Sequence, residues 1–460
     1  MKGHPPLLAI VGPTIIDGNG GTPIKDGVIL IDGDRLVSVG DGSTPIPLEA
    51  RLISATGQYA IPGLMDANVH LFQDLFNGPH SLIRYAGRYE HLAIEAAQVC
   101  LRGGVTTVFD TWGPRNSLVQ ARDAVNSGNA VGSRIYLAGN LVGLGGPFSD
   151  DFFAKGREVL PEDLTTSIDA VWQENVGPEL LWMSPEQVRK EIREYAQRNI
   201  DFVKFALTTH RDKQQHIMFS PRVTQVIVEE AHRAGLTAQT HTTTNEGLHL
   251  AIQAGVELMQ HVDLTFGTEP IPPETISLMA EVGIPGALLP QTAKALEWFR
   301  ENTWRTPWLK RYETMDRNDR ALVNAGVALL LSTDAGLFSV ETLNSSTWKS
   351  CQPPEENLLM LGEGHFHWLL AVEQKGMKPM DALMAATRNI ARAYKVDQQL
   401  GTLEKGKLAD LLLLDRNPLE AAANYRSISL VVKDGSVIDR EALPTQRFLT
   451  TQTAPQAWES

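Results

Sequence analysis

The sequence has almost no cysteine: Cys100 and Cys351 are the only two thiols in 460 residues. Two thiols exclude a disulfide framework and a zinc site made of several thiolates, and they indicate a reducing compartment. The apolar stretch near the start, before Gly12 and Pro13, is too short for a signal peptide or a membrane segment. We therefore expect a cytoplasmic protein that does not enter a membrane.

Positive charge is also scarce. Lys and Arg number 41 against 54 Asp and Glu, so the formal net charge is −13. An acidic protein repels phosphates of nucleic acids and anionic lipids, and partners of these classes are not expected. We expect a small neutral or cationic ligand, and a homo-oligomer on general grounds.

Short β-branched stretches separated by Asp-Gly and Asn-Gly turns occupy residues 7–63. Such turns are typical of antiparallel hairpins. The same pattern returns in the last quarter of the chain. The sequence therefore predicts one small β-sandwich domain built from residues 1–60 and 398–445, with residues 446–460 as a C-terminal tail.

Between these ends, short apolar stretches alternate with longer helical patterns. Eight stretches are candidate buried strands: 61–70, 104–113, 133–140, 201–210, 236–242, 255–264, 283–290 and 326–336. Several follow a helical segment that ends in Gly, as at Gly235, Gly255 and Gly326. Repeated helix-to-strand units predict an α/β fold, a (β/α)8 TIM barrel over residues 61–397. A doubly wound open sheet is the alternative, but no Gly-rich nucleotide fingerprint follows the first strand.

Polar side chains that bind metals recur at the carboxyl ends of the predicted strands. They are His70, Lys204, His241, His261 and Asp334. In a barrel these ends share one mouth, where barrel enzymes place their sites. A single such His is most often a core imidazole, but three at separate strand ends favour one metal site. Imidazole and carboxylate suit zinc, with cobalt, manganese and iron as alternatives.

Lys204 is unusual in this set because an ammonium group repels a cation. Burial beside a metal lowers the pKa of a lysine, and the free amine then adds carbon dioxide to give a carbamate anion. We predict a carbamylated Lys204 as a metal ligand. The alternative is a lysine paired with a carboxylate inside the barrel.

The chain resembles the metal-dependent amidohydrolase superfamily over nearly its whole length. The resemblance rests on the motifs IPGLMDANVH, VKF, THT, QHVD and STDAG, an early IIDG, and ATRNIARAY followed by GTLEKGKLADLLLLD. The branch it resembles most is that of the imidazolonepropionase-like and prolidase-like enzymes. The resemblance implies a ligand order of His-x-His on the first strand, Lys on the fourth, His on the fifth and sixth, and Asp on the eighth.

Asn68 departs from the His-x-His pattern. Strand residues two apart face the same way, so Asn68 lies beside His70, yet it offers only an amide. We therefore predict one divalent metal per subunit instead of two. Asn-x-His resembles the subgroup of the phenylurea hydrolases and molinate hydrolase, which implies N-aryl ureas, carbamates or thiocarbamates as substrates. The alternative is an incidental change in a dipeptidase-like enzyme.

In this reading Asp334 takes a proton from water and returns it to the leaving nitrogen. A urea carbonyl is deactivated by two nitrogens, so the tetrahedral oxyanion needs hydrogen-bond donors. The candidate donors are His70, Asn68 and His210. Cleavage of the C–N bond on the aryl side releases an aniline and a carbamic acid.

Aromatic side chains are frequent in the segments that follow the predicted strands, as an aryl ligand would require. Candidate substrate contacts are Phe72, Phe76, Trp112, Trp298 and His210. Packing of lids or subunit contacts is the alternative for each aromatic. His365 and His367 imitate a His-x-His pair, but we favour packing for both.

Two further functions stay open. A related hydrolase of X-Pro dipeptides, N-acyl amino acids or cyclic amides is one, and Arg211 is the nearby cation that would hold a carboxylate. A non-catalytic scaffold is the other, but it would not need to keep Lys204, His241, His261 and Asp334.

Overall fold

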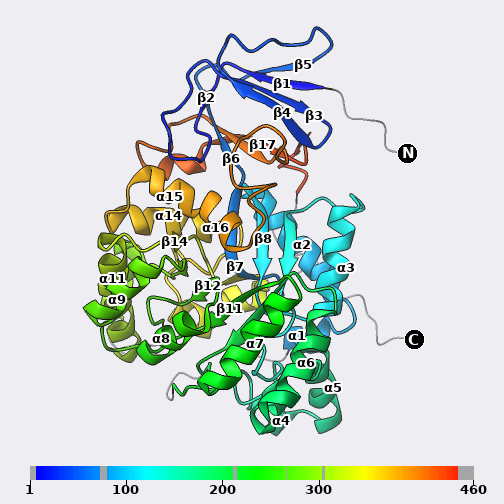
Figure 1. The fold of residues 1–460 in the computed structure, drawn as a ribbon, viewed down its shortest axis with the longest axis vertical. Helices are drawn as coiled ribbons and strands as arrows, with labels where there is room; N and C mark the ends of the chain where they lie inside the picture. Colours follow the sequence, from blue (N-terminus) through cyan, green and yellow to red (C-terminus); the bar gives the residue numbers. More distant parts are fainter. Residues whose placement is uncertain (1–6, 73–79, 211–214, 266, 303–305, 444–460) are drawn as a thin grey trace.

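The structure is a computed structural model that describes residues 7–72, 80–210, 215–265, 267–302 and 306–443. Phe76, Arg211 and the predicted tail 446–460 lie outside the described residues. Within the described part, a barrel of parallel strands surrounded by helices carries two β sheets at one end (Figure 1).

The barrel strands among the described residues are β7 (Leu64–His70), β8 (Val105–Asp110), β9 (Arg134–Leu137), β10 (Phe202–Ala206), β11 (Thr237–His241), β12 (Leu258–Gln260), β13 (Gly286–Ala287) and β14 (Leu329–Leu330). They fall in the eight predicted stretches. Strands β10 to β14 pair in chain order, and so do β7 to β9. The short strand β15 (Ala335–Gly336) pairs in parallel with β7.

Two contacts close these strands into a ring. A parallel bridge between Val142 and Phe205 joins the segment after β9 to β10. The Ala67 N–H donates to the Leu331 carbonyl at 2.9 Å, which joins β7 to the segment after β14. The predicted TIM barrel is confirmed.

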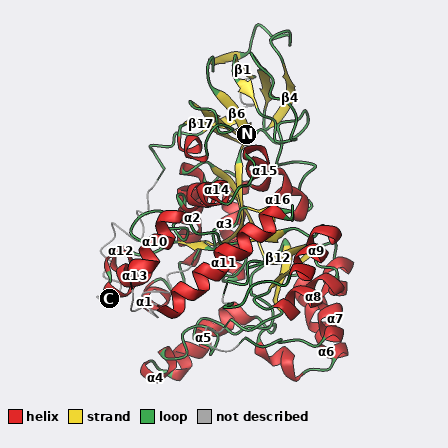
Figure 2. Cartoon of the chain, turned by 90° about the vertical axis from the view of Figure 1, so that its left-hand side faces the viewer, coloured by secondary structure: helices red, strands yellow, loops and turns green. Residues whose placement is uncertain are grey.

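Helices follow the strands and cover the outside of the barrel (Figures 1 and 2). In the described residues they are α1 (His80–Arg84), α2 (Tyr89–Arg102), α3 (Arg115–Asn126), α4 (Gly156–Val159), α5 (Glu162–Gln173), α6 (Pro185–Ala196), α7 (Pro221–Arg233), α8 (Asn245–Ala254), α9 (Pro273–Val282), α10 (Ala293–Glu301), α11 (Thr306–Asn324), α12 (Val340–Asn344), α13 (Ser346–Cys351), α14 (Gly364–Gln374), α15 (Pro379–Ala385) and α16 (Arg388–Ala393), with the 3-10 turns η2 (Pro178–Trp182) and η4 (Ala422–Arg426).

Local sequence sets the ends of these helices. Before α6, the Ser184 side chain accepts from the Gln187 N–H while the Gln187 side chain accepts from the Ser184 N–H, which forms a capping box. Helix α8 begins after Thr244, whose hydroxyl accepts from the Gly247 N–H, and it ends at Gly255 with φ +75°. Such a φ favours glycine, so this predicted helix end is confirmed.

Both chain ends contribute to the two remaining sheets. Their strands are β1 (Leu8–Val11), β2 (Thr14–Ile15), β3 (Val28–Asp32), β4 (Arg35–Gly40), β5 (Arg51–Ser54), β6 (Tyr59–Pro62), β16 (Leu411–Leu414), β17 (Ile428–Lys433) and β18 (Ser436–Val437). One sheet has the order β4-β3-β1-β5 and the other β18-β17-β16-β6-β2. A shared cluster of buried side chains includes Ile10, Ile31, Ala60, Leu411 and Val432. Residues 1–60 with 398–445, and 61–397, remain our proposed domain boundaries.

The hairpin expectation for the start of the chain is only partly correct. Strands β1 and β3, and β3 and β4, pair antiparallel, but β1 pairs in parallel with β5, and β2 in parallel with β6. The reason is that the chain passes between the two sheets three times, from β1 to β2, from β2 back to β3, and from β5 to β6. Gly12, with φ +88°, lies at the first passage, where a Cβ atom would come within 2.6 Å of Thr56 Oγ1.

Among the described residues, none of the helices is both long enough and apolar enough to span a bilayer.

Candidate active site

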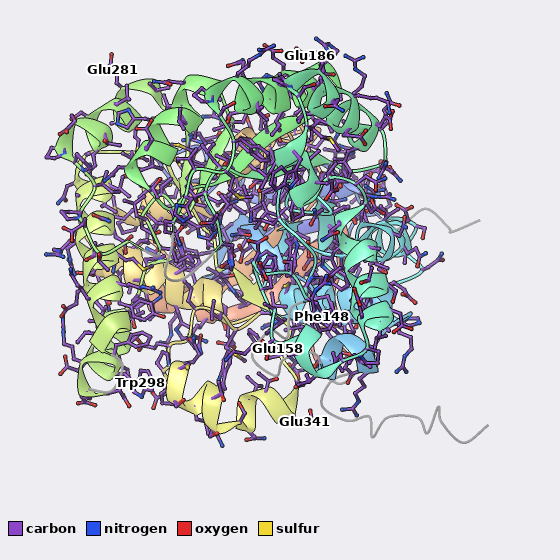
Figure 3. The ribbon with its side chains drawn as sticks, turned by 90° about the horizontal axis from the view of Figure 1, so that it is seen from below. Phe148, Glu158, Glu186, Glu281, Trp298 and Glu341 are labelled. Carbon is purple, nitrogen blue, oxygen red and sulfur yellow. The ribbon has the colours of Figure 1, made fainter. Side chains whose placement is uncertain are left out.

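The candidate residues lie at the barrel end that faces away from the terminal sheets. Strand β6 pairs with β16 in a terminal sheet and continues at once into β7, so the carboxyl end of β7 points away from that sheet. Every side chain of β7 is buried, including those of Asp66, Asn68 and His70. Figure 3 views the molecule from this far end.

Asp334 receives two hydrogen bonds from β7. The Asn68 amide donates from Nδ2 to Asp334 Oδ1 at 2.8 Å, and His70 Nε2 lies 3.1 Å from the same oxygen. His70 Nδ1 lies 3.3 Å from the Trp112 carbonyl, which orients the ring. The structure thus brings together the three residues predicted to be catalytic.

Lys204 approaches this group from β10. Its Nζ donates to Thr111 Oγ1 at 2.9 Å, and the Thr111 hydroxyl donates to Asn68 Oδ1. The Lys204 side chain is almost fully buried. A carboxylate partner within ion-pair distance, the alternative expected for Lys204, is not present among the described residues.

Three imidazoles complete the site. The ring centroids of His241 and His261 are 4.7 Å apart, and those of His210 and His241 are 5.3 Å apart. His261 Nδ1 lies 3.2 Å from the Thr265 hydroxyl. The Nε2 atom of His241 is buried without a hydrogen-bond partner in the described part of the chain. Such an atom needs a ligand to offset its loss of hydration.

The backbone at two of these residues is strained. His261 has φ +60° and Asp334 has φ +54°. The left-handed region costs a residue with a side chain roughly 1–2 kcal/mol, and the surrounding structure offsets this cost. His261 directly follows β12, and Asp334 comes four residues after the end of β14. The turn after each strand therefore directs the side chain into the mouth of the barrel.

Burial dominates the acid–base behaviour of the site. It lowers the pKa of Lys204 to about 8, although the carboxylates of Asp334 and Asp110 oppose the shift. It lowers the pKa of His261 to about 3, and it also lowers those of His210 and His241. These imidazoles are therefore neutral at pH 7, as metal ligands must be.

Asp334 behaves differently. Burial acts to raise its pKa, but the hydrogen bond from His70 and the nearby positive charges outweigh that effect. The pKa of Asp334 falls below the usual value for Asp. The carboxyl group is therefore ionised at neutral pH and can accept a proton.

These groups surround a small cavity of about 30 Å3. Its lining consists of His70, Trp112, Leu141, Phe152, Lys204, His210, His241, His261 and Asp334. The volume corresponds to roughly one water molecule, whereas pockets for drug-sized ligands measure about 300–1,000 Å3. Phe152 closes one side, because its ring stacks on Trp112 at 4.1 Å between centroids.

The predicted aromatic contacts fall into three groups. Trp112 and His210 line the cavity, whereas Phe72 packs beside it against Tyr89 at 4.5 Å between ring centroids. Trp298 lies on α10 at the edge of the face shown in Figure 3, against Phe299. Phe76 lies outside the described residues. The substrate-binding roles of these residues remain predictions.

Sequence reasoning missed three residues of the site, namely Thr111, Phe152 and Leu141. Thr111 stands next to Trp112 in the FDTWG motif, but a threonine hydroxyl gives no distinctive sequence signal. Phe152 lies in the long segment between β9 and α4, where the aromatic composition was visible but the contact with Trp112 was not. The histidines of GEGHFHW pack on α14: His365 Nε2 lies 2.9 Å from the Gly103 carbonyl, and His367 contacts Arg426.

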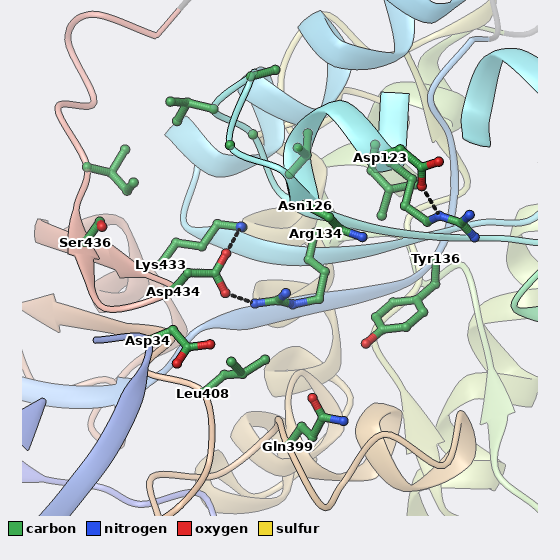
Figure 4. A pocket seen from close by; sticks show the side chains of 18 of the residues that line it. Asp34, Asp123, Asn126, Arg134, Tyr136, Gln399, Leu408, Lys433, Asp434 and Ser436 are labelled. Carbon is green, nitrogen blue, oxygen red and sulfur yellow. Dashed lines mark hydrogen bonds and ion pairs between the residues drawn. The ribbon is translucent and has the colours of Figure 1, made fainter. Parts of the chain in front are cut away.

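A larger cleft of about 950 Å3 lies at the opposite end of the barrel (Figure 4). Its charged side chains pair with one another. Arg134 binds Asp434, Lys433 binds Asp434 at 2.5 Å, and Arg122 binds Asp201 at 3.1 Å. Arg134 begins β9, so the cleft is at the amino ends of the strands, where barrel enzymes do not place catalytic groups.

The donor set at the carboxyl ends fits one divalent cation, provided that Lys204 takes part. Among the described residues, no three imidazole, thiol or carboxylate side chains converge closely enough to hold an ion by themselves. The buried, unpartnered His241 Nε2 and the neutral state of His261 nevertheless match the chemistry of a metal site. An additional anionic ligand is what a carbamate on Lys204 would supply.

Comparisons with known proteins agree with this geometry. The model of the amidohydrolase family matches residues 59–438. The solved structure of molinate hydrolase is 38% identical and superimposes with a TM-score of 0.89, covering 95% of this chain and 96% of its own. Phenylurea hydrolase B is 35% identical with a TM-score of 0.89, covering 95% of this chain and 98% of its own.

A curated relative is more distant. The ochratoxinase of Aspergillus niger is 26% identical over 438 residues, which cover 90% of this chain and 82% of that protein. The expected resemblance is confirmed. The chain belongs to the amidohydrolase family, as a hydrolase of C–N bonds with the structural type of molinate hydrolase and phenylurea hydrolase B.

Proposed function

We propose that this amidohydrolase cleaves the C–N bond of N-aryl ureas to give an aniline and a carbamic acid, which loses carbon dioxide. The observation that carries the proposal is the aromatic face of Trp112, on which the Phe152 ring stacks, beside Asp334 and Lys204. A phenyl ring is neutral and flat, and it gains from stacking on such a wall. The aryl group of the substrate takes the face of Trp112 that Phe152 covers, because the cavity itself is too small for it.

The residues proposed to hold the metal are Lys204, His241, His261, His70 and Asp334. We propose one ion per subunit, zinc by preference, with cobalt, manganese or iron as alternatives. When bound, the ion polarises the substrate carbonyl and lowers the pKa of water. Carbamylation of Lys204 is part of the proposal, because its pKa of about 8 leaves free amine at neutral pH.

Asp334 is the proposed proton carrier. Its Oδ1 atom accepts the bonds from Asn68 and His70, which leaves Oδ2 for a water molecule. The carboxylate takes a proton from water as the oxygen attacks the urea carbon. As the C–N bond breaks, the bonding electrons stay on the aryl nitrogen, and Asp334 returns the proton to it.

His70, Asn68 and His210 are the proposed donors to the oxyanion that forms at the carbonyl. His70 and Asn68 already bind Asp334 on one side of the cavity, whereas His210 approaches from beside Phe152, with 5.0 Å between the ring centroids. His210 is therefore the best placed of the three to donate to a substrate that enters at Trp112.

The charge of the cavity distinguishes this function from peptide hydrolysis. No guanidinium belongs to the described cavity lining, and its one cation, Lys204, is engaged with Thr111. A dipeptide or N-acyl amino acid needs a cationic partner for its carboxylate. We therefore rank prolidase-type activity below urea hydrolysis, and a non-catalytic scaffold lower still.

Thiocarbamate or carbamate hydrolysis is the second candidate. The fit to molinate hydrolase is as close as that to phenylurea hydrolase B, with a TM-score of 0.89 for each. The same carbonyl chemistry applies, but the substrate of this alternative does not need an aromatic ring. Comparing aryl and alkyl substrates therefore separates the two.

We also propose a homo-oligomer. The segment 156–182 exposes large apolar side chains: Val159 is 77% exposed and Trp182 90%. Such exposure favours a subunit contact. Light scattering of the wild type and Trp182→Glu tests this, since a monomeric wild type would contradict it. The cytoplasmic location remains a prediction.

The deciding experiment measures metal content per subunit together with aniline release from N,N-dimethyl-N′-phenylurea. About one metal and steady aniline release are expected. One metal without aniline, but with turnover of an S-alkyl thiocarbamate, would favour the second candidate. Absence of both metal and turnover would refute the hydrolytic site.

A further inference from the structure

A directional chain of hydrogen bonds crosses the barrel from Lys204 to Asp334. Lys204 Nζ donates to Thr111 Oγ1 at 2.9 Å, the Thr111 hydroxyl donates to Asn68 Oδ1, and Asn68 Nδ2 donates to Asp334 Oδ1 at 2.8 Å. These residues come from β10, β7 and the segments after β8 and β14. Thr111 is fully buried, so water does not compete for its hydroxyl.

The direction of the chain follows from the donors available. An ionised carboxylate only accepts, so the NH2 group of Asn68 must face Asp334 and its carbonyl oxygen must face Thr111. That oxygen also only accepts, so it takes the single hydroxyl proton of Thr111. The lone pairs of Thr111 Oγ1 are then left for Lys204, whose nitrogen carries the remaining protons.

We propose that Thr111 is a positioning residue that holds the Lys204 nitrogen, so that the carbamate oxygens on it would bind the metal, and that it fixes the amide orientation of Asn68. The inference rests on the proposed metal role of Lys204. A carbamylated lysine retains one N–H on its nitrogen, and Thr111 accepts that N–H as it accepts from the free amine. The rotation of the carbamate about its stem is thereby restricted.

The same geometry explains an amide at position 68. The residue between Thr111 and Asp334 has to accept on one side and donate on the other. An amide does both without a charge and without changing its protonation state. A carboxylate at this position would repel Asp334. Asn68 is therefore the link between Thr111 and Asp334. Thr111 extends this link to Lys204.

Thr107 provides a matched control. It lies on β8, the strand that ends just before Thr111, and is equally buried, but its hydroxyl has no hydrogen-bond partner among the described residues. Replacing Thr107 by Val removes a buried, unsatisfied hydroxyl, so neither stability nor zinc affinity should fall. Thr111→Val makes the same chemical change at the position that we assign.

The test measures the zinc affinity of metal-free protein by competition with a chelator, in the presence of bicarbonate. Thr111→Val is expected to weaken zinc binding by about 10- to 100-fold, the usual effect of losing a residue that orients a ligand. Thr111→Ser, which keeps the hydroxyl, should restore the affinity to within about threefold of wild type. Thr107→Val should bind as wild type does.

Three outcomes would overturn the inference. The first is a Thr111→Val variant that binds zinc as tightly as wild type but melts at a lower temperature. This result would show that the hydroxyl contributes to stability and not to metal binding. Equal losses in Thr107→Val and Thr111→Val would show a general effect of the substitution, and failure of Thr111→Ser to recover would exclude the hydroxyl. If Thr111→Val does not fold, Thr111→Ala replaces it with the same criteria.

The result is separable from the proposed substrate, because no substrate enters the assay. A wild-type protein that binds zinc but releases no aniline refutes urea hydrolysis and leaves the Thr111 comparison decisive. A wild-type protein that binds no zinc overturns both proposals.

Discussion

The rings of Trp112 and Phe152 stack with 17° between their planes and 4.1 Å between their centroids. This pair fills the space next to Asp334 that a substrate ring requires. Phe152→Ala should therefore lower KM for a phenylurea by several-fold, since no side chain has to leave Trp112 first. Steady-state kinetics on N,N-dimethyl-N′-phenylurea measures this. Phe153→Ala, in the same segment, is the control and should leave KM unchanged.

Trp112 provides the opposite prediction. Trp112→Leu keeps an apolar wall but removes the aromatic face, and an aromatic contact contributes about 0.5–1.5 kcal/mol beyond its buried area. KM for a phenylurea should rise by roughly three- to tenfold, with kcat nearly unchanged, whereas KM for a dialkyl carbamate should hardly move. An equal loss with both substrates would show that the ring does not bind there.

Asn68→His restores the His-x-His pattern at the end of β7. We expect the metal content to rise from about one to about two ions per subunit, because the new imidazole lies beside His70 and Asp334. The rate should fall, since the link from Thr111 to Asp334 is lost. Elemental analysis reports the metal content. Unchanged metal content with an unchanged rate would contradict our account of Asn68.

Lys204→Ala removes the only lysine nitrogen among the described residues that line the cavity. Loss of most bound metal and of activity is expected. Short carboxylic acids such as propionate should partly restore both, because a carboxylate can occupy the place of the carbamate. Lys204→Arg serves as the control, since its cation fills the space but forms no carbamate. An alanine variant with full metal content would exclude the ligand role.

Metal loading should depend on pH through Lys204. Its pKa of about 8 means that the reactive amine is a minor fraction at pH 7 and about half at pH 8. At a fixed pressure of carbon dioxide, where the concentration of dissolved CO2 does not change with pH, the initial rate of zinc uptake by metal-free protein should therefore increase severalfold between these values. His261, with a pKa of about 3, is already neutral throughout this range and adds no dependence. A rate that is flat or falls with pH would contradict carbamylation.

The barrel and the main site residues were predictable because their signals are local and periodic. Each candidate ligand ends an apolar stretch, and parallel strands bring such ends together whatever the helices between them contain. Gly255 shows the same for helix ends, where a left-handed φ favours glycine. The sequence of β7 therefore indicated both the strand and the orientation of Asn68 and His70.

Contacts between distant segments could not be predicted in this way. Thr111 and Phe152 have ordinary side chains, and their roles follow from partners far away in the sequence, such as Lys204 and Trp112. The parallel pairing of β1 with β5 was missed because turn residues indicate the pairing only of strands that follow each other in the sequence. Trp298 was predicted as a substrate contact only because it is aromatic and follows a predicted strand. In the structure it lies on α10, and its ring contacts that of Phe299.

The backbone N–H of Asp334 donates to the backbone carbonyl of Asn68 at 2.9 Å. This bond lies at the seam where the last barrel strand meets the first. The residues on either side of this bond are separated by 266 positions in the chain. The proton acceptor is therefore oriented only after the chain has gone once around the ring. Hydrogen exchange at the Asp334 amide would report ring closure and active-site assembly as a single event, and a protein opened at this seam would lose catalysis before it lost its helices.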